Sequence, residues 1–273
     1  MSMFINTNVG AINAHRNLGI NNSAMGKTME KLSSGFRINR AADDAAGLAI
    51  SEKMRFQING YNQATRNAQD GISMIQTAEG ALTEVHSMLQ RMNTLANQAA
   101  TGTYEDKDRD KLDLEFKELV KEIDNIADNT KFNGKALFDG STTKVGFQVG
   151  FEKDVKIEAE FESTKADKLG VKTTDNIKTS GAASTAMANI QSAINSVSAI
   201  RAKLGSVQNR LEHTINNLGV NAENLSASES RIRNADMAKE MTDFTRNQIL
   251  VQAGTAMLAQ ANSAPQSVLK LLG

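Results

Sequence analysis

The sequence predicts a mainly α-helical protein, a long antiparallel helical bundle or coiled-coil rod with a small β-hairpin region. Apolar or small residues recur at spacings of three and four over three long segments, a pattern typical of helices that pack along their whole length. Only one short segment replaces this spacing with strict alternation. The 273 residues include a single proline and 4% aromatic residues, which favours long helices over a compact α/β enzyme.

The first long helix is predicted from about residue 44 to residue 100. Its apolar stripe consists of Ala68, Ile72, Ile75, Ala78, Leu82, Val85, Leu89, Met92, Ala96 and Ala99. A helix of this length extends about 85 Å at a rise of about 1.5 Å per residue, much longer than a globular helix needs. The sequence therefore predicts a rod.

Two further helices are predicted to pack against the first. The second has Leu112, Phe116, Leu119, Ile123 and Ile126 on one face. The intervening TGTYEDKD reads as a turn, so the first two helices should be antiparallel. The third stripe consists of Met187, Ile190, Ile194, Val197, Leu204, Val207, Leu211, Ile215, Leu218, Ala222 and Leu225. We expect it to pack on the first two helices, each buried Leu or Ile contributing roughly 1.5–3 kcal/mol.

Strict alternation marks a hairpin between the second and third helices. One strand carries Val145, Phe147, Val149 and Phe151, and the other carries Val155, Ile157, Ala159 and Phe161. Residues 152–154 fit a short connection, and Asn133-Gly134 predicts another turn upstream. Residues 163–185 are rich in Ser, Thr, Lys and Gly and predict a surface loop.

Several segments of the chain closely resemble bacterial flagellins. Residues 29–55 read MEKLSSGFRINRAADDAAGLAISEKMR, and residues 253–272 read AGTAMLAQANSAPQSVLKLL. Three internal segments are also similar: QDGISMIQTAEGAL at 69–82, FNGK at 132–135 and RAKLGSVQNRLEHTINNL at 201–218. The resemblance implies a structural subunit that polymerises into the bacterial flagellar filament for swimming motility, and no enzyme.

The two ends are predicted to be assembly elements. The flagellin resemblance implies that residues 1–43 form an N-terminal inner-tube helix, which assembles with a C-terminal one, residues 236–273. Residues 44–235 would form a rod-like bundle with the hairpin near 145–161. The self-assembly residues would be Ile5, Val9, Ile12, Met29, Leu32, Leu250, Met257, Leu258, Val268 and Leu271. Helices with so few large apolar residues are marginal alone, so both ends are expected to fold only when subunits stack.

Composition excludes several functions. Zero net charge removes the electrostatic reason to expect nucleic acid or an anionic membrane as a partner. The absence of cysteine excludes disulfides and thiolate zinc sites. With no secretory signal and no run that could cross a bilayer, the composition suggests a cytoplasmic protein. The flagellin resemblance overrides this reading, because it implies secretion through the flagellum's own export channel to the extracellular filament.

No catalytic, cofactor or metal site is predicted. Asp43 and Asp44 point about 100° apart on a helix and are better suited to a helix start than to an acid pair. None of His15, His86 and His213 belongs to a His-Glu-x-x-His motif. There is also no Gly-x-Ser-x-Gly elbow.

The resemblance also implies partners. Gln90, Arg91, Leu95 and Glu115 match positions through which flagellins engage Toll-like receptor 5. A plainer interpretation is that Arg91 and Glu115 only bridge adjacent helices, contributing at most about 1 kcal/mol. The family also implies an export chaperone on the C-terminal segment, and hook-associated and cap proteins. The alternatives are a flagellar hook-filament junction protein and, from another functional class, a cytoplasmic coiled-coil adaptor.

Overall fold

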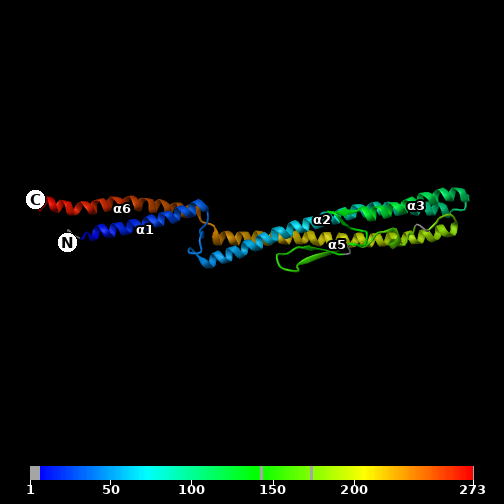
Figure 1. Ribbon diagram of the computed structural model, residues 1–273, viewed down its shortest axis with the longest axis horizontal. Coiled ribbons are helices and arrows are strands. Elements are labelled where there is room, and N and C mark those ends of the chain that lie inside the picture. Colours follow the sequence, from blue (N-terminus) through cyan, green and yellow to red (C-terminus); the bar gives the residue numbers. More distant parts are fainter. Residues whose placement is uncertain (1–6, 142–143, 173–174, 273) are drawn as a thin grey trace. The chain divides into compact units, whose positions relative to one another are not determined.

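The computed structural model describes residues 7–141, 144–172 and 175–272, with side chains up to Ser263 (Figure 1). The helices are α1 (Val9–Ser34), α2 (Ala45–Ala100), α3 (Asp106–Asn129), α4 (Ala166–Leu169), α5 (Ser180–Arg233) and α6 (Met237–Leu272). The strands are β1 (Lys131–Phe132), β2 (Lys135–Ala136), β3 (Lys144–Gln148) and β4 (Lys156–Glu160). The predicted mainly α fold with a small hairpin region is confirmed.

The chain forms two compact units. The first contains the chain up to Phe56 and from Asn224 onward, and the second is Gln57–Glu223. Both α2 and α5 continue from one unit into the other. The predicted division at residues 43/44 and 235/236 follows the ends of helices instead, and it stays a prediction.

The core of the second unit lies between α2, α3 and α5. The α2 stripe is buried as predicted from Ala68 to Ala99, except for Ile72, which is partly exposed. Phe116 of α3 and Leu204 of α5 join the same core. Figure 1 shows α3 and α5 running opposite to α2. These long helices form because each stripe buries one face against the other two.

Two antiparallel hairpins follow α3. Strands β1 and β2 are joined by Asn133 and Gly134, both with positive φ (48° and 79°), as a type I′ turn requires. Strands β3 and β4 pair with Val145 opposite Ala159 and Phe147 opposite Ile157, which confirms the predicted alternation.

Two glycines of α2 let the second hairpin approach closely. A Cβ atom on Gly71 would lie 3.0 Å from the ring of Phe147, and one on Gly60 would collide with Phe151. Glycine costs about 1 kcal/mol inside a helix relative to alanine. Here the cost is offset because two aromatic side chains can pack directly on the helix backbone.

The segment after β4 differs from the predicted surface loop. Ala166, Leu169, Val171 and Ile177 are all buried in the core. It is fastened to α3 by carboxylates, since the Asp113 side chain accepts a hydrogen bond from the Ile177 amide at 3.0 Å and Asp124 accepts one from Ala166 at 2.8 Å. The prediction failed because these apolar residues follow no period, so composition alone suggested a loop.

Replacing Asp113 with alanine is expected to lower the free energy of unfolding by about 1–3 kcal/mol, because the buried amide of Ile177 loses its acceptor. Lys117, 2.8 Å from the same carboxylate, would also lose its partner. Urea unfolding measures the change. Asp110→Ala is the matched control, since Asp110 pairs with Lys178 on an exposed surface, and it should cost less than about 1 kcal/mol. Equal effects of the two substitutions would contradict this account.

Candidate assembly interface

The helices α1 and α6 form an antiparallel pair within the first unit (Figure 1). On α1 the partly buried side facing the pair includes Ala11, Ala14, Leu18, Asn21, Met25 and Thr28. On α6 it includes Phe244, Asn247, Val251, Gly254, Leu258 and Ala261. The spacing is heptad-like, but more than half of these residues are small or polar. We call this contact the seam.

The predicted self-assembly residues fall on both sides of the pair. Leu32 and Leu258 are partly buried. Val9 and Ile12 are each 58% exposed and Met257 is 64% exposed, and Met29 and Leu250 are also exposed. Ile5 and the side chains of Val268 and Leu271 lie outside the described residues.

No described residue of α1 is buried. A helix normally gains most of its stability by burying an apolar face. Here most large apolar side chains of the pair remain at the surface, and so the pair has an incomplete core. An exposed apolar surface of this kind is typical of a site of interaction with other proteins.

The first unit also contains a junction, where the segment after α1 pairs with the segment before α6. Phe36 forms an antiparallel bridge with Asn234. The amide of Arg37 donates to the Arg233 carbonyl at 2.7 Å, and the amide of Ala235 donates to the Gly35 carbonyl at 2.9 Å. Gly35 has φ 73° and ends α1, which turns the chain into this pairing. We call residues 35–37 and 233–235 the clasp.

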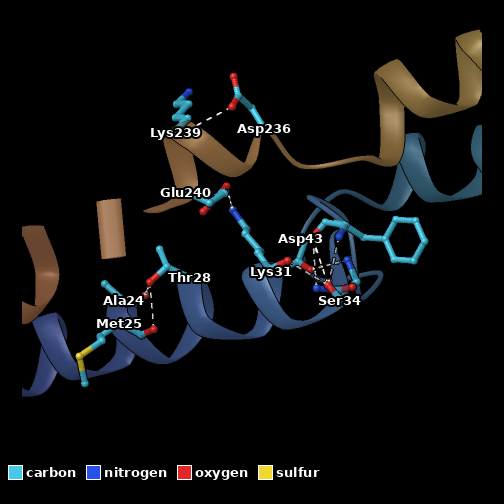
Figure 2. A network of polar contacts seen from close by, with 11 residues as sticks. Ala24, Met25, Thr28, Lys31, Ser34, Asp43, Asp236, Lys239 and Glu240 are labelled. Atoms are coloured by element: carbon cyan, nitrogen blue, oxygen red, sulfur yellow. Dashed lines mark hydrogen bonds and ion pairs between the residues drawn. The ribbon is translucent and has the colours of Figure 1, made fainter. Parts of the chain in front are cut away.

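Charged side chains reinforce the clasp. The Arg233 guanidinium lies 4.9 Å from the centre of the Phe36 ring and forms an ion pair of 2.6 Å with Glu52 of α2. One helical turn from the clasp, Lys31 of α1 pairs with Glu240 of α6 at 3.4 Å (Figure 2). Glu240 is buried, so its charge needs this partner.

Asp44 caps the start of α2, as predicted, whereas Asp43 closes the turn that precedes this helix. Asp43 accepts hydrogen bonds from the amides of Asn39 (3.1 Å) and Arg40 (3.0 Å), and Asp44 accepts one from Gly47 (2.8 Å) in the first turn of α2. The amide donors of Arg40 and Asn39 lower the pKa of Asp43. Ile38 is buried close to Gly47. A Cβ atom at position 47 would lie only 2.8 Å from the Ile38 side chain.

Acidification is expected to loosen the turn in which Asp43 binds the amides of Asn39 and Arg40. Because the pKa of Asp43 is lower in the folded state, its contribution is present above its ordinary pKa of 3.8 and is lost as the pH falls through the folded value. NMR titration should place the Asp43 midpoint below 3.8, with the amide shifts of Asn39 and Arg40 following it. In Asp43→Asn these amides should show no such step. A midpoint at or above the ordinary value would contradict the prediction.

The predicted receptor residues lie on α2 and α3 of the second unit. Arg91 and Glu115 are exposed and form an ion pair of 2.7 Å. Gln90 is exposed and contacts Nε2 of His86 at 3.0 Å. Leu95 is only 1% exposed and belongs to the core, so its side chain is not accessible on this surface.

The described part of the chain contains no candidate membrane span and no candidate metal site. None of the described helices is long and apolar enough to cross a membrane. Within the same residues, no three His, Asp or Glu side chains are grouped so that they could hold a metal ion.

Sequence reasoning missed the clasp and the Lys31–Glu240 pair. The Ser-Ser-Gly sequence at residues 33–35 lies where α1 ends, but it does not indicate what the following segment pairs with. Both contacts join residues about two hundred positions apart, and no local pattern encodes such a pairing. The helix pair with its exposed apolar surface is typical of a structural subunit of a larger assembly.

Comparisons with known proteins agree. The family described as bacterial flagellin N-terminal helical region matches residues 5–143, and the bacterial flagellin C-terminal helical region matches residues 187–272. The chain is 55% identical to a flagellin of Halalkalibacterium halodurans and 51% identical to a flagellin of Bacillus subtilis, each over 99% of this chain and 100% of the relative. It therefore belongs to the bacterial flagellin family.

Solved structures are also similar. The crystal structure of Bacillus cereus flagellin matches with a TM-score of 0.50 and 36% identity, over 56% of this chain and 88% of that one. A putative flagellar hook-associated protein from Vibrio parahaemolyticus matches with a TM-score of 0.60 over 70% of this chain and 100% of that one. Its 14% identity shows a shared fold alone.

Membership of this family gives the chain its role, a structural subunit of the flagellar filament and not an enzyme. Full-length identity near one half to flagellins does not favour the junction protein or the coiled-coil adaptor.

Proposed function

We propose that the chain polymerises through its terminal helices, with residues 1–43 and 236–273 forming the inner tube of the filament. The observation that carries this proposal is the incomplete core of the α1/α6 pair. Val9, Ile12, Met29, Leu250 and Met257 are exposed in the single chain and would be covered by neighbouring subunits. Ile5, Val268 and Leu271 are proposed to extend the same contact.

Hydrogen exchange on monomer and polymer tests this proposal. Amides of α1 and α6 should exchange quickly in the monomer, because little packing holds these helices closed, and slowly in the polymer. The buried parts of α2 and α5 serve as an internal control and should be protected in both states. Equal protection of α1 in monomer and polymer would contradict the proposal.

Further partners follow from the same role. We propose that the subunit is secreted through the flagellar export channel and that it contacts hook-associated and cap proteins at the filament ends. Before export, a chaperone would cover the C-terminal segment, where Met257 offers a largely exposed apolar side chain. If this is correct, a chain truncated before Gly254 should no longer bind the chaperone.

A second proposed activity is recognition by Toll-like receptor 5 through Gln90, Arg91 and Glu115, with Leu95 beneath them. The observation that favours it is the exposed Arg91–Glu115 pair, which presents both charges on neighbouring helices. Arginine is enriched among residues that dominate binding energy.

Replacing Arg91 with alanine is expected to raise the concentration needed for half-maximal receptor signalling by about tenfold or more, because a charged contact is lost. A reporter cell line measures this. Arg66→Ala is the control, since Arg66 is another exposed arginine of α2, and among the described residues its side chain is hydrogen-bonded only to Gln63. Unchanged signalling by Arg91→Ala would support the plainer interpretation, a bridge between two helices.

A further inference from the structure

The α1/α6 contact keeps one register over its whole length. From the Phe36–Asn234 bridge, Lys31 is five residues back and Glu240 six residues forward. Leu18 is eighteen residues back and Gly254 twenty residues forward, and a Cβ atom on Gly254 would lie 3.3 Å from the Leu18 side chain. Asn8 is twenty-eight residues back and Ala261 twenty-seven forward, joined by a hydrogen bond of 2.7 Å.

The seam itself encodes this register only weakly. Its residues repeat at heptad-like spacing, so a shift of two helical turns would again place seam residues opposite seam residues. Alanine, glycine, asparagine and threonine fill about half of these positions and pack nearly as well after a shift. Packing therefore gives little preference for one alignment over another.

The contacts near the clasp are specific. The bridge and its two backbone hydrogen bonds allow one pairing of residues 35–37 with residues 233–235. A shift of one turn would also leave the buried carboxylate of Glu240 without Lys31. A specific polar pair at one position of a helix interface is a well-attested way in which proteins fix register.

We propose that the clasp, together with the Lys31–Glu240 pair, sets the register in which the two terminal helices meet. Subunits then present the exposed stripe of α1 and that of α6 in one fixed alignment, which a regular polymer requires. This inference rests on the proposed function, because it explains how the two terminal helices of that function become aligned. Its test does not depend on polymerisation, so either proposal can fail alone.

Disulfide trapping in the soluble full-length chain reports the register, because the chain has no cysteine of its own. In the double variant Leu18→Cys with Gly254→Cys, the two Cβ atoms would lie 3.9 Å apart, within the usual disulfide range of about 3.5–4.5 Å. Leu18→Cys with Asn247→Cys reports a shift of seven residues. Slow oxidation accumulates even transient pairings, and the first variant should cross-link on the order of tenfold faster.

Duplicating residues 244–250 separates the two possible sources of register. If the clasp sets it, Leu18→Cys should now cross-link to a cysteine in the second copy of position 247, which takes the place of Gly254. If the distal contacts set it, cross-linking to Gly254→Cys should persist and the inserted heptad should bulge out. This second result would overturn the proposal, and so would equal cross-linking of both pairs in the chain without the duplication.

Two matched variants complete the test. Duplicating residues 255–261 also lengthens α6 by seven residues but leaves the distance from the clasp to Gly254 unchanged, so the original cross-link should remain. Conversely, Arg37→Pro with Ala235→Pro removes both backbone donors of the clasp. Combined with Lys31→Met and Glu240→Leu, it should bring the two cross-linking rates closer together while the unfolding transition of the second unit stays in place. Unchanged rates in this variant would overturn the role of the clasp.

Discussion

Replacing Phe116 with alanine is expected to lower the free energy of unfolding of the second unit by about 3–5 kcal/mol, the usual cost of removing a buried aromatic side chain. Phe116 has no exposed surface and lies between α2, α3 and α5. The rigid helices around it cannot collapse into the space it leaves, so a cavity adds to the lost burial. Thermal or urea unfolding followed by circular dichroism measures the change.

The same helix provides a matched control. Leu114 is 66% exposed although it is only two residues from Phe116. Leu114→Ala should therefore change stability by less than about 0.5 kcal/mol. A cost for Phe116→Ala as small as that of the control would mean that α3 does not pack on the bundle through this face.

The three long helices of the second unit could be predicted from the spacing of their apolar residues. Phe116 belongs to the predicted stripe of α3, and the stripes of α2 and α5 were likewise located from spacing alone. Periodicity succeeds here because a long helix that buries one face repeats the same environment every three or four residues. Many positions then indicate the same buried face, so one partly exposed residue such as Ile72 does not obscure the pattern.

Prediction failed where a segment packs without a period. Residues 163–172 and 175–179 run over the core and bury single side chains such as Leu169 and Ile177 at irregular intervals. Their polar neighbours made the segment resemble a loop. The carboxylates that fasten it, Asp113 and Asp124, come from a helix about forty to sixty residues away, a partnership that only the folded chain reveals.

At the candidate site, the sequence located the assembly helices but not the direction of each side chain. The predicted assembly residues of α6 included both Leu250 and Leu258. In the structure Leu258 lies in the seam, whereas Leu250 points outward. The weak periodicity of this helix could not separate a face that packs within the chain from a face left for another subunit.

That outward face leads to the second large expected effect. Replacing Val9, Ile12 and Met257 together with asparagine should prevent filament growth at concentrations where the unchanged protein polymerises. Each side chain is about 60% exposed in the single chain. If neighbouring subunits cover that surface, each contributes about 1–1.5 kcal/mol, and the three together raise the critical concentration roughly a hundredfold to a thousandfold.

Electron microscopy and sedimentation in a kosmotropic salt measure this effect, because such salts strengthen apolar burial. The control is a chain with Asn13→Gln and Gln260→Asn, exposed polar positions on the same two helices. It should polymerise normally, since it changes side-chain length but not apolar area.

Stability separates assembly from folding in these variants. The three substituted side chains do not belong to the core of the second unit, and so its unfolding transition should stay unchanged. Loss of filaments with an intact transition assigns the effect to contacts between subunits. Filaments of normal length from the triple variant would mean that the exposed stripe is not the assembly surface, and the terminal helices would then have to associate through other faces.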